Sequence, residues 1–265
     1  MAEYENRYAT ASTRTQGAAI DAGLRSYMLT VYNYMAGGVA LTGLVAYVLF
    51  SQAITLDPAL AAKSATGGAY ALKRGMYLTQ LGATLYASPL KWVVMLAPLA
   101  FVLVLSFGIN KMSTSVAQLC FWAYAAVMGV SLSSIFMVFT HTSIAQMFFV
   151  TAAAFASLSI YGYTTKKDLS GWGSFLFMGL IGIILAGLVN LFLKSSALQF
   201  AISAIGVLVF AGLTAYDTQR IKDTYFEVAG NAELAAKAAI MGALSLYLDF
   251  INMFMMMLQL FGNRD

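Results

Sequence analysis

The chain has 265 residues, of which 60% are hydrophobic and only 10% are charged, and its mean hydropathy is +0.77. So few charged side chains cannot cover a soluble globule, which excludes a soluble globular fold. The formal net charge of +4 lies in tails and loops and forms no basic stripe, so we expect no nucleic-acid partner. The composition indicates an all-α polytopic membrane protein in contact with the lipid bilayer.

The elements follow one another as a polar tail and seven apolar runs. Residues 1–26 are polar and contain no apolar run with a cleavage motif, so we expect a cytoplasmic tail and no removable signal peptide. A helix of about 20 residues crosses the roughly 30 Å hydrocarbon layer. We predict spans at 27–50, 90–109, 115–139, 143–163, 172–193, 198–217 and 234–262, which form one transmembrane domain over 27–262. Residues 51–89 are expected to form an external loop with a short interfacial helix.

The basic residues predict the orientation, because cytoplasmic loops carry an excess of Lys and Arg. One side has Arg7, Arg14, Arg25, Lys111, Lys166, Lys167, Arg220, Lys222 and Lys237, and the other has Lys63, Lys73, Arg74, Lys91, Lys194 and Arg264. The richer side includes the amino terminus, which is therefore predicted to be cytoplasmic. Seven crossings then put the carboxyl terminus outside.

Cysteine and histidine are too few for the common metal sites. Cys120 is the only cysteine, so an intrachain disulfide or a cysteine-based metal cluster is impossible within this chain. His141 is the only histidine, and we interpret it as a loop residue whose titration near neutral pH could modulate activity. We expect no resident cofactor.

The seventh run has a polar face. If it is helical, Ala238, Gly242, Ser245, Asp249, Asn252, Met256 and Gln259 share one side at spacings of four and three. The opposite side carries Ile240, Leu244, Leu248, Ile251, Met255 and Leu258, which could meet lipid or other helices. A carboxylate at mid-bilayer is costly, so Asp249 should point into protein or water. We therefore predict an inner helix whose small polar face, with Gly242, Ser245 and Asn252, lines a pore.

Two of the eleven acids stand out, because the others lie in tails, loops or helix ends. Asp217 lies at the predicted cytoplasmic end of the sixth span, and Asp249 lies about halfway along the seventh. If the two carboxyls meet in a poorly solvated place, both cannot cheaply ionise, and the pair would share a proton and act as a pH sensor. When both are ionised, their oxygens would suit a hard cation such as Ca²⁺.

Simpler roles stay open for both acids. Asp217 could form an interfacial ion pair with Arg220 or Lys222, and Asp249 could have a structural hydrogen-bonding role. An intramembrane protease needs paired aspartates with a motif such as Gly-x-Gly-Asp, whereas Asp217 follows Ala215-Tyr216. We therefore expect that the protein is not an enzyme.

The two aspartate motifs resemble those of the Bax inhibitor-1 family, also called the transmembrane Bax inhibitor motif family. The similarity lies in residues Gly212–Gln219 (GLTAYDTQ) and Ala243–Asn252 (ALSLYLDFIN), with further matches at Tyr161–Ser170 and Leu132–Ile135. It covers the chain from the first span to Gly262. Bacterial members are seven-helix proteins whose last helix is surrounded by the other six, and they are described as pH-sensitive calcium leak channels.

The resemblance implies roles for three residues. Asp217 and Asp249 would be the paired aspartates of the pH sensor. Lys111 lies nearest to a basic residue of the family that interacts with this pair, although lysine lacks the bidentate fork of arginine. Arg220, one turn after Asp217, is assigned to gating as well.

Two functions follow from these observations. The first is pH-gated Ca²⁺ permeation across the inner membrane of a bacterium by a monomer that handles Ca²⁺ and H⁺. The second, to which family members have also been linked, is a regulator or adaptor of a membrane-embedded quality-control protease or of a stress or cell-death partner. The polar tail Met1–Ser26 would be the docking handle of such an adaptor.

Overall fold

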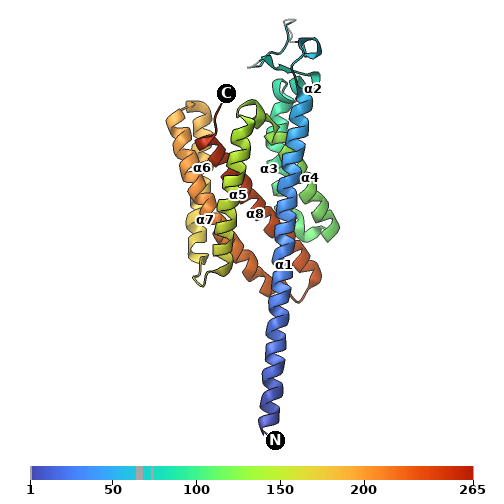
Figure 1. Ribbon diagram of the computed structural model, residues 1–265, viewed down its shortest axis with the longest axis vertical. Helices are drawn as coiled ribbons and strands as arrows, with labels where there is room; N and C mark the ends of the chain where they lie inside the picture. Colours follow the sequence, from blue (N-terminus) through green and yellow to red (C-terminus); the bar gives the residue numbers. More distant parts are fainter. Residues whose placement is uncertain (1, 64–67, 73–74, 265) are drawn as a thin grey trace.

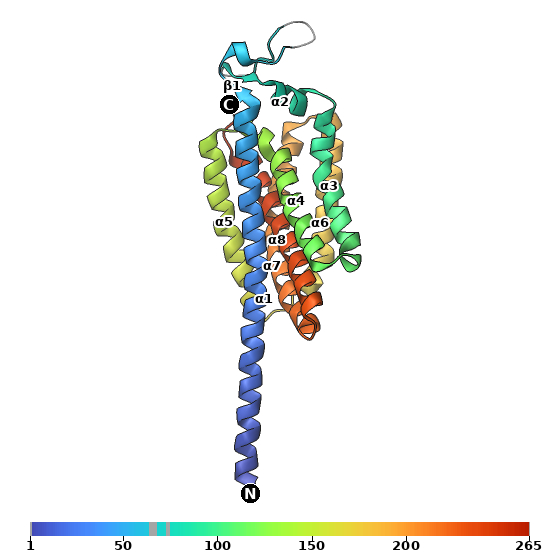
Figure 2. The same cartoon turned by 90° about the vertical axis from the view of Figure 1, so that its right-hand side faces the viewer.

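Seven long helices dominate the computed structural model (Figures 1 and 2). The structure describes residues 2–63, 68–72 and 75–264, and side chains from residue 21 onward. Within these residues, seven helices are long and apolar enough to cross a membrane, as predicted. They are α1 (Ala2–Ala53), α3 (Leu90–Gly108), α4 (Thr114–Leu132), α5 (His141–Thr164), α6 (Ser170–Leu193), α7 (Ser196–Val228) and α8 (Ala232–Phe261).

Short elements join these helices. Strands β1 (Ile54–Thr55) and β2 (Tyr77–Leu78) pair antiparallel above the bundle, with the turn η1 (Pro58–Leu60) between them. Helix α2 (Gln80–Gly82) and the π-helical turn η3 (Ala83–Ala87) then lead into α3, while η4 (Ile109–Lys111) and η5 (Ser133–Met137) extend α3 and α4. The side chains of Arg7 and Arg14, and residues Lys73 and Arg74, all used to predict orientation, lie outside the described part.

Side-chain caps fix where several helices begin. Ser113, Thr140 and Ser195 each accept a hydrogen bond from the backbone N–H three residues later, at 3.4, 3.1 and 3.3 Å. Asn231 accepts from the N–H groups of Glu233 and Leu234 at the start of α8. Such caps satisfy backbone donors that have no partner inside the helix, and they therefore favour a helix start at these positions.

Two helices are longer than the apolar runs that predict them. The backbone of α1 is helical from Ala2, so the helix extends beyond the bundle without a break at residue 27 (Figure 2). Helix α7 continues past residue 217 to Val228, because residues 218–228 contain neither Gly nor Pro and Gly230 is the first such residue. Asp217 therefore lies inside a helix with about three further turns beyond it.

Helix α8 lies at the centre of the bundle and runs obliquely through it (Figure 1). It packs against α7, α1, α5 and α4, and it is the most buried of the seven spans. Helices α3 and α6 are the least buried and expose many large apolar side chains, as lipid-facing helices do. The amino-terminal end of α1 and the carboxyl end of α8 lie at opposite ends of the molecule (Figures 1 and 2).

Small residues allow two pairs of helices to approach closely. A Cβ added at Gly129 in α4 would lie 2.7 Å from the carbonyl oxygen of Thr42 in α1. A Cβ at Gly162 in α5 would collide with the backbone of Ala215 in α7. These contacts hold α4 and α5 tightly against their neighbours, as small residues do at membrane helix interfaces.

Candidate functional site

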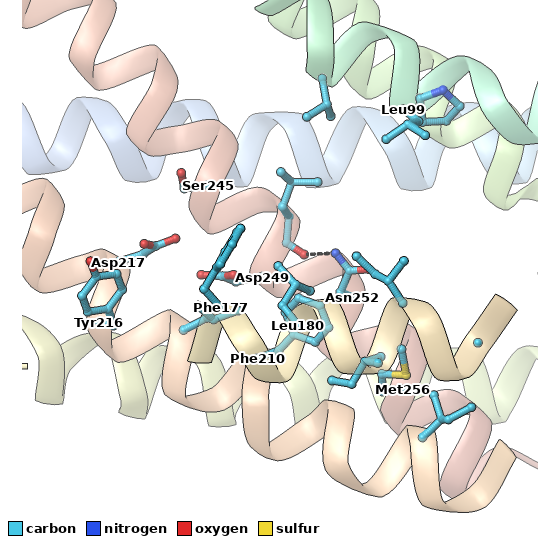
Figure 3. A pocket seen from close by; sticks show the side chains of 18 of the residues that line it. Leu99, Phe177, Leu180, Phe210, Tyr216, Asp217, Ser245, Asp249, Asn252 and Met256 are labelled. Atoms are coloured by element: carbon cyan, nitrogen blue, oxygen red, sulfur yellow. Dashed lines mark hydrogen bonds between the residues drawn. The ribbon is translucent and has the colours of Figure 1, made fainter. Parts of the chain in front are cut away.

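A large cavity of about 880 Å³ lies beside the central helix (Figure 3). Five helices line it, namely α3, α4, α6, α7 and α8. Its polar lining residues are Tyr124, Ser174, Gln199, Tyr216, Asp217, Arg220, Ser245, Asp249, Asn252 and Gln259. Leu99 of α3, and Phe177 and Ile184 of α6, also line it and are more than half exposed, so apolar side chains form its outer rim.

Asp217 and Asp249 both line this cavity and point toward one another from neighbouring helices (Figure 3). Both residues are buried, with exposed fractions of 8% and 4%. The packing of α7 against the central helix α8 places both carboxyl groups on the wall of one cavity.

The two carboxylates differ in their partners. Asp217 forms an ion pair with Arg220, one turn later on α7; its Oδ1 atom lies 3.4 Å from a guanidinium nitrogen of Arg220. The Oδ2 atom of Asp249 is buried and has no hydrogen-bond partner among the described residues. A buried carboxylate without partners is costly unless a proton or a cation compensates its charge.

Arg220 connects the acid pair with the surface. Its side chain is 55% exposed and stacks over the Tyr216 ring at 5.8 Å from the ring centroid. It also donates a hydrogen bond of 3.5 Å to the hydroxyl of Ser245 on α8. Arg220 therefore bridges α7 and α8 at the end of the cavity nearest to the start of α8.

The polar side of α8 follows the cavity for most of its length. Ser245, Asp249, Asn252, Met256 and Gln259 all line it. Asn252 lines the cavity, and its amide nitrogen donates to the Leu248 carbonyl at 2.8 Å. From residue 245 to residue 259, this side extends about 21 Å along the helix axis.

Two residues predicted for the site lie elsewhere. Gly242 is buried against the Ile221 side chain and does not line the cavity, which ends one turn further along α8. Lys111 is exposed at the end of η4 and is not part of the lining either. Of the two basic residues assigned to gating, the structure places Arg220 beside the aspartates.

Sequence reasoning missed several lining residues. Tyr124 of α4 lines the cavity, and its buried hydroxyl has no hydrogen-bond partner in the part of the chain that the structure describes. Gln199 of α7 lines the opposite end from Arg220. A glutamine inside an apolar run was a usable signal for the second residue, whereas nothing in the apolar run around Tyr124 distinguishes it from an ordinary core residue.

The site offers few ligands to a metal ion. In the part of the chain that the structure describes, no group of three or more His, Cys, Asp and Glu residues could hold one. Calcium takes six to eight oxygen ligands. A cation at the aspartate pair would therefore keep much of its water shell, with further oxygens from Ser245 and Asn252 nearby.

The fold and the cavity together define a seven-helix membrane protein with a buried acid pair beside its central helix. The profile of the family described as "Inhibitor of apoptosis-promoting Bax1" matches residues 24–265. The chain therefore belongs to the Bax inhibitor-1 family.

Bacterial relatives match over nearly their whole length. An uncharacterised protein of Rickettsia prowazekii is 44% identical over 96% of this chain and 97% of its own length. Inner membrane protein YbhL of Escherichia coli K12 is 46% identical over 92% of this chain and 94% of its own length. An uncharacterised membrane protein of Streptococcus pyogenes is 35% identical over 92% and 96%. The similarity therefore extends over more than nine tenths of this chain in all three cases.

Proposed function

We propose that this protein is a passive, pH-gated Ca²⁺ leak channel of the bacterial inner membrane, with its amino terminus in the cytoplasm. Asp217 and Asp249 form its proton sensor. The observation that carries the proposal is the buried Oδ2 atom of Asp249. It has no hydrogen-bond partner among the described residues, and it belongs to a carboxylate that lines the same cavity as a second carboxylate. The proposal assigns no catalytic residue and no resident cofactor.

Protonation controls the charge of the cavity. Two neighbouring carboxylates away from bulk water cannot both ionise cheaply, so at lower pH they hold one proton in common. The remaining negative charge is balanced by Arg220, 3.4 Å from Asp217. At higher pH the proton leaves, and the second negative charge repels the first until a cation enters. Carboxylate oxygens are ligands that Ca²⁺ prefers, so we expect the Ca²⁺ flux to rise with pH.

Weak binding of the cation at the aspartate pair is compatible with ion permeation. A permeating ion must bind well enough to enter and weakly enough to leave. Two carboxylates with amide and hydroxyl oxygens nearby give a cation few direct ligands, so it keeps part of its hydration shell. The polar side of α8 then provides a path beyond the pair toward Gln259.

Ca²⁺ flux into proteoliposomes that contain an internal Ca²⁺ indicator tests this proposal. The purified protein is measured over a pH series from acidic to alkaline. Asp249→Asn removes the ionisable group with little change in shape, so the flux should lose most of its dependence on pH. Asp217→Asn should do the same, because the proton is shared.

A matched control separates the pair from other acids. Asp223 lies on the same helix as Asp217 but is exposed and does not line the cavity. Asp223→Asn should therefore leave the pH profile of the flux unchanged. An unaltered profile in both Asp249→Asn and Asp217→Asn would refute the sensor, and absence of Ca²⁺ flux from the wild-type protein would refute the channel.

A further inference from the structure

A second polar cluster lies at the other end of the cavity. It consists of Asn190 near the end of α6, Gln199 and Ser203 near the start of α7, and Gln259 near the end of α8, and we call it the amide cluster. Gln199 and Gln259 line the cavity, as the aspartates do. Ten residues of α8 separate Asp249 from Gln259, which corresponds to about 15 Å along the helix. The cavity therefore has an acidic end and an amide end.

The members of the amide cluster are hydrogen-bonded to one another across three helices. The Gln199 amide nitrogen donates to the Gln259 amide oxygen. The Ser203 hydroxyl donates to the same oxygen at 3.1 Å, and Asn190 donates to the Gln199 amide oxygen at 3.1 Å. Asn190 in turn accepts from the backbone N–H of Ser195 at 2.9 Å. The side-chain carbonyl oxygens of Asn190, Gln199 and Gln259 are thus all occupied by protein donors.

These bonds join the helices near one end of the bundle. Helix α6 ends at Leu193, α7 begins at Ser196, and α8 ends at Phe261. Asn190 and Ser203 are buried, whereas Gln199 and Gln259 are half-buried at the end of the cavity. Interhelical hydrogen bonds between neutral side chains in membranes are individually weak, so such a cluster can open at low cost.

We propose that the amide cluster is a second closure of the cavity, at the face where α8 ends. In the closed arrangement, Gln259 is held by Gln199 and Ser203 across the end of the polar side of α8. When Gln259 leaves these partners, the cavity becomes continuous with water at that face. The Gln259 amide oxygen, which then lacks its two protein donors, is free for a hydrated divalent cation, because hard cations prefer oxygen ligands.

The inference deepens the proposed channel function, since a path for ions needs an opening at both ends. The cluster contains only Asn, Gln and Ser, which do not titrate in the ordinary pH range, so this closure differs in kind from the aspartate pair. Protonation thus controls the acidic end of the cavity, whereas neutral hydrogen bonds control the amide end. A test of the second closure must detect water access to the cavity independently of Ca²⁺ flux.

Cysteine accessibility provides that test. Cys120 is the only cysteine, so Cys120→Ala gives a full-length background without thiols. Met256→Cys then places one thiol in the cavity, one turn before Gln259. A membrane-impermeant thiol reagent is applied separately to each face. From the face where α8 ends, we expect slow labelling in the background and an increase of about tenfold when Gln259→Leu removes two weak interhelical bonds.

A carboxamide elsewhere in the bundle gives the matched control. The Gln118 amide of α4 donates to the Tyr34 hydroxyl of α1 at 2.6 Å, and neither residue lines the cavity. Gln118→Leu should leave the labelling rate of Met256→Cys unchanged. If Gln259→Leu does not yield folded protein, Gln199→Leu breaks the same cluster from α7 and should give the same increase.

Three results would overturn the closure. These are fast labelling from that face in the background, no increase in either folded cluster variant, or an equal increase in Gln118→Leu. The flux assay keeps the two proposals apart. Gln259→Leu should raise the Ca²⁺ leak at every pH and keep the wild-type dependence on pH. If the wild-type protein passes no Ca²⁺, the channel proposal fails, while the labelling result still decides on the closure.

Discussion

The two sides of α8 differ in how they are packed. One side carries Leu246, Tyr247, Phe250 and Met253, which are almost fully buried against α1, α4 and α5. The other side carries Ser245, Asp249, Asn252 and Gln259 along the cavity. The same helix is thus anchored on one side and borders open space on the other. A helix can hold a poorly compensated carboxylate at the centre of a membrane protein when its other side is well packed.

Two of the four buried residues on the packed side, Tyr247 and Phe250, are aromatic. The Phe250 ring lies 5.5 Å from Phe148 and 5.6 Å from Phe155, both in edge-on geometry. Tyr247 contacts Tyr124 in the same way at 5.4 Å, and its hydroxyl lies 2.6 Å from that of Thr42 on α1. Such pairs add to the stabilisation from burial alone. We expect changes on this side to alter stability and changes on the cavity side to alter function.

The largest difference between the two sides should come from adding a carboxylate to each. Leu246 is fully buried on the packed side, so Leu246→Asp creates an uncompensated buried charge and should cost about 3 kcal/mol or more. Its neighbour Ser245 lines the cavity within 3.5 Å of Arg220, so Ser245→Asp gains a partner and should remain folded. The yield of monodisperse protein and its thermal unfolding in detergent measure both effects. Equal losses in the two variants would show that the two sides do not differ in this way.

A smaller difference in stability should appear when the hydroxyl group is removed from each of two buried tyrosines. The Tyr247 hydroxyl shares a hydrogen bond with Thr42, whose hydroxyl also contacts the carbonyl oxygens of Gly38 and Ala125. Tyr247→Phe should therefore cost about 1 kcal/mol, or about 2 to 4 °C in Tm. The Tyr124 hydroxyl, at the edge of the cavity, has no partner within the described ranges, so Tyr124→Phe should be neutral or stabilising. A lower Tm for Tyr124→Phe than for Tyr247→Phe would reverse the comparison.

The fold could be predicted from the sequence because each span is a long apolar run. Seven spans are present in the described residues, and the last helix is central. The exact ends of α7 could not be predicted from hydropathy, because a helix does not end where it leaves the apolar layer. Its ends depend on local backbone propensity, and residues 218–228 contain no helix breaker.

The candidate site was only partly accessible to sequence reasoning. Helical spacing places Ser245, Asp249 and Asn252 on one side, since that pattern is local. On α8 the cavity wall begins at Ser245 and does not include Gly242. At the amide end, Gln199 is hydrogen-bonded to Gln259, which is 60 residues away in the sequence. The register between packed helices decides such contacts, and a single sequence does not contain it. The contacts of the motif residue Gln219 also could not be predicted from the sequence. Its side chain holds the loop between α5 and α6, because it accepts from the Leu169 N–H and donates to the Lys167 carbonyl.

The smallest predicted effect concerns a carboxylate outside the bundle. Asp168 is exposed in the loop before α6, and hydrogen bonds from the hydroxyl and the backbone N–H of Ser170 hold the pKa of its carboxyl below the usual range. Its stabilisation is therefore present above the ordinary pKa of aspartate and is lost as the pH falls through the lowered value. Asp168→Ala should lower Tm slightly at neutral pH, and the difference from wild type should vanish in acid.

Asp168 and the aspartate pair should differ in their effect on the pH profile of the Ca²⁺ flux. Because Asp168 changes its charge only in acid, Asp168→Ala should leave the pH profile of the Ca²⁺ flux near neutral pH unchanged. Tm measured across a pH series, together with the flux assay, checks both expectations. A shift of the neutral-range flux profile in Asp168→Ala would mean that charge at the surface loop, and not only in the cavity, controls the response to pH. The aspartate pair would then no longer explain that response by itself.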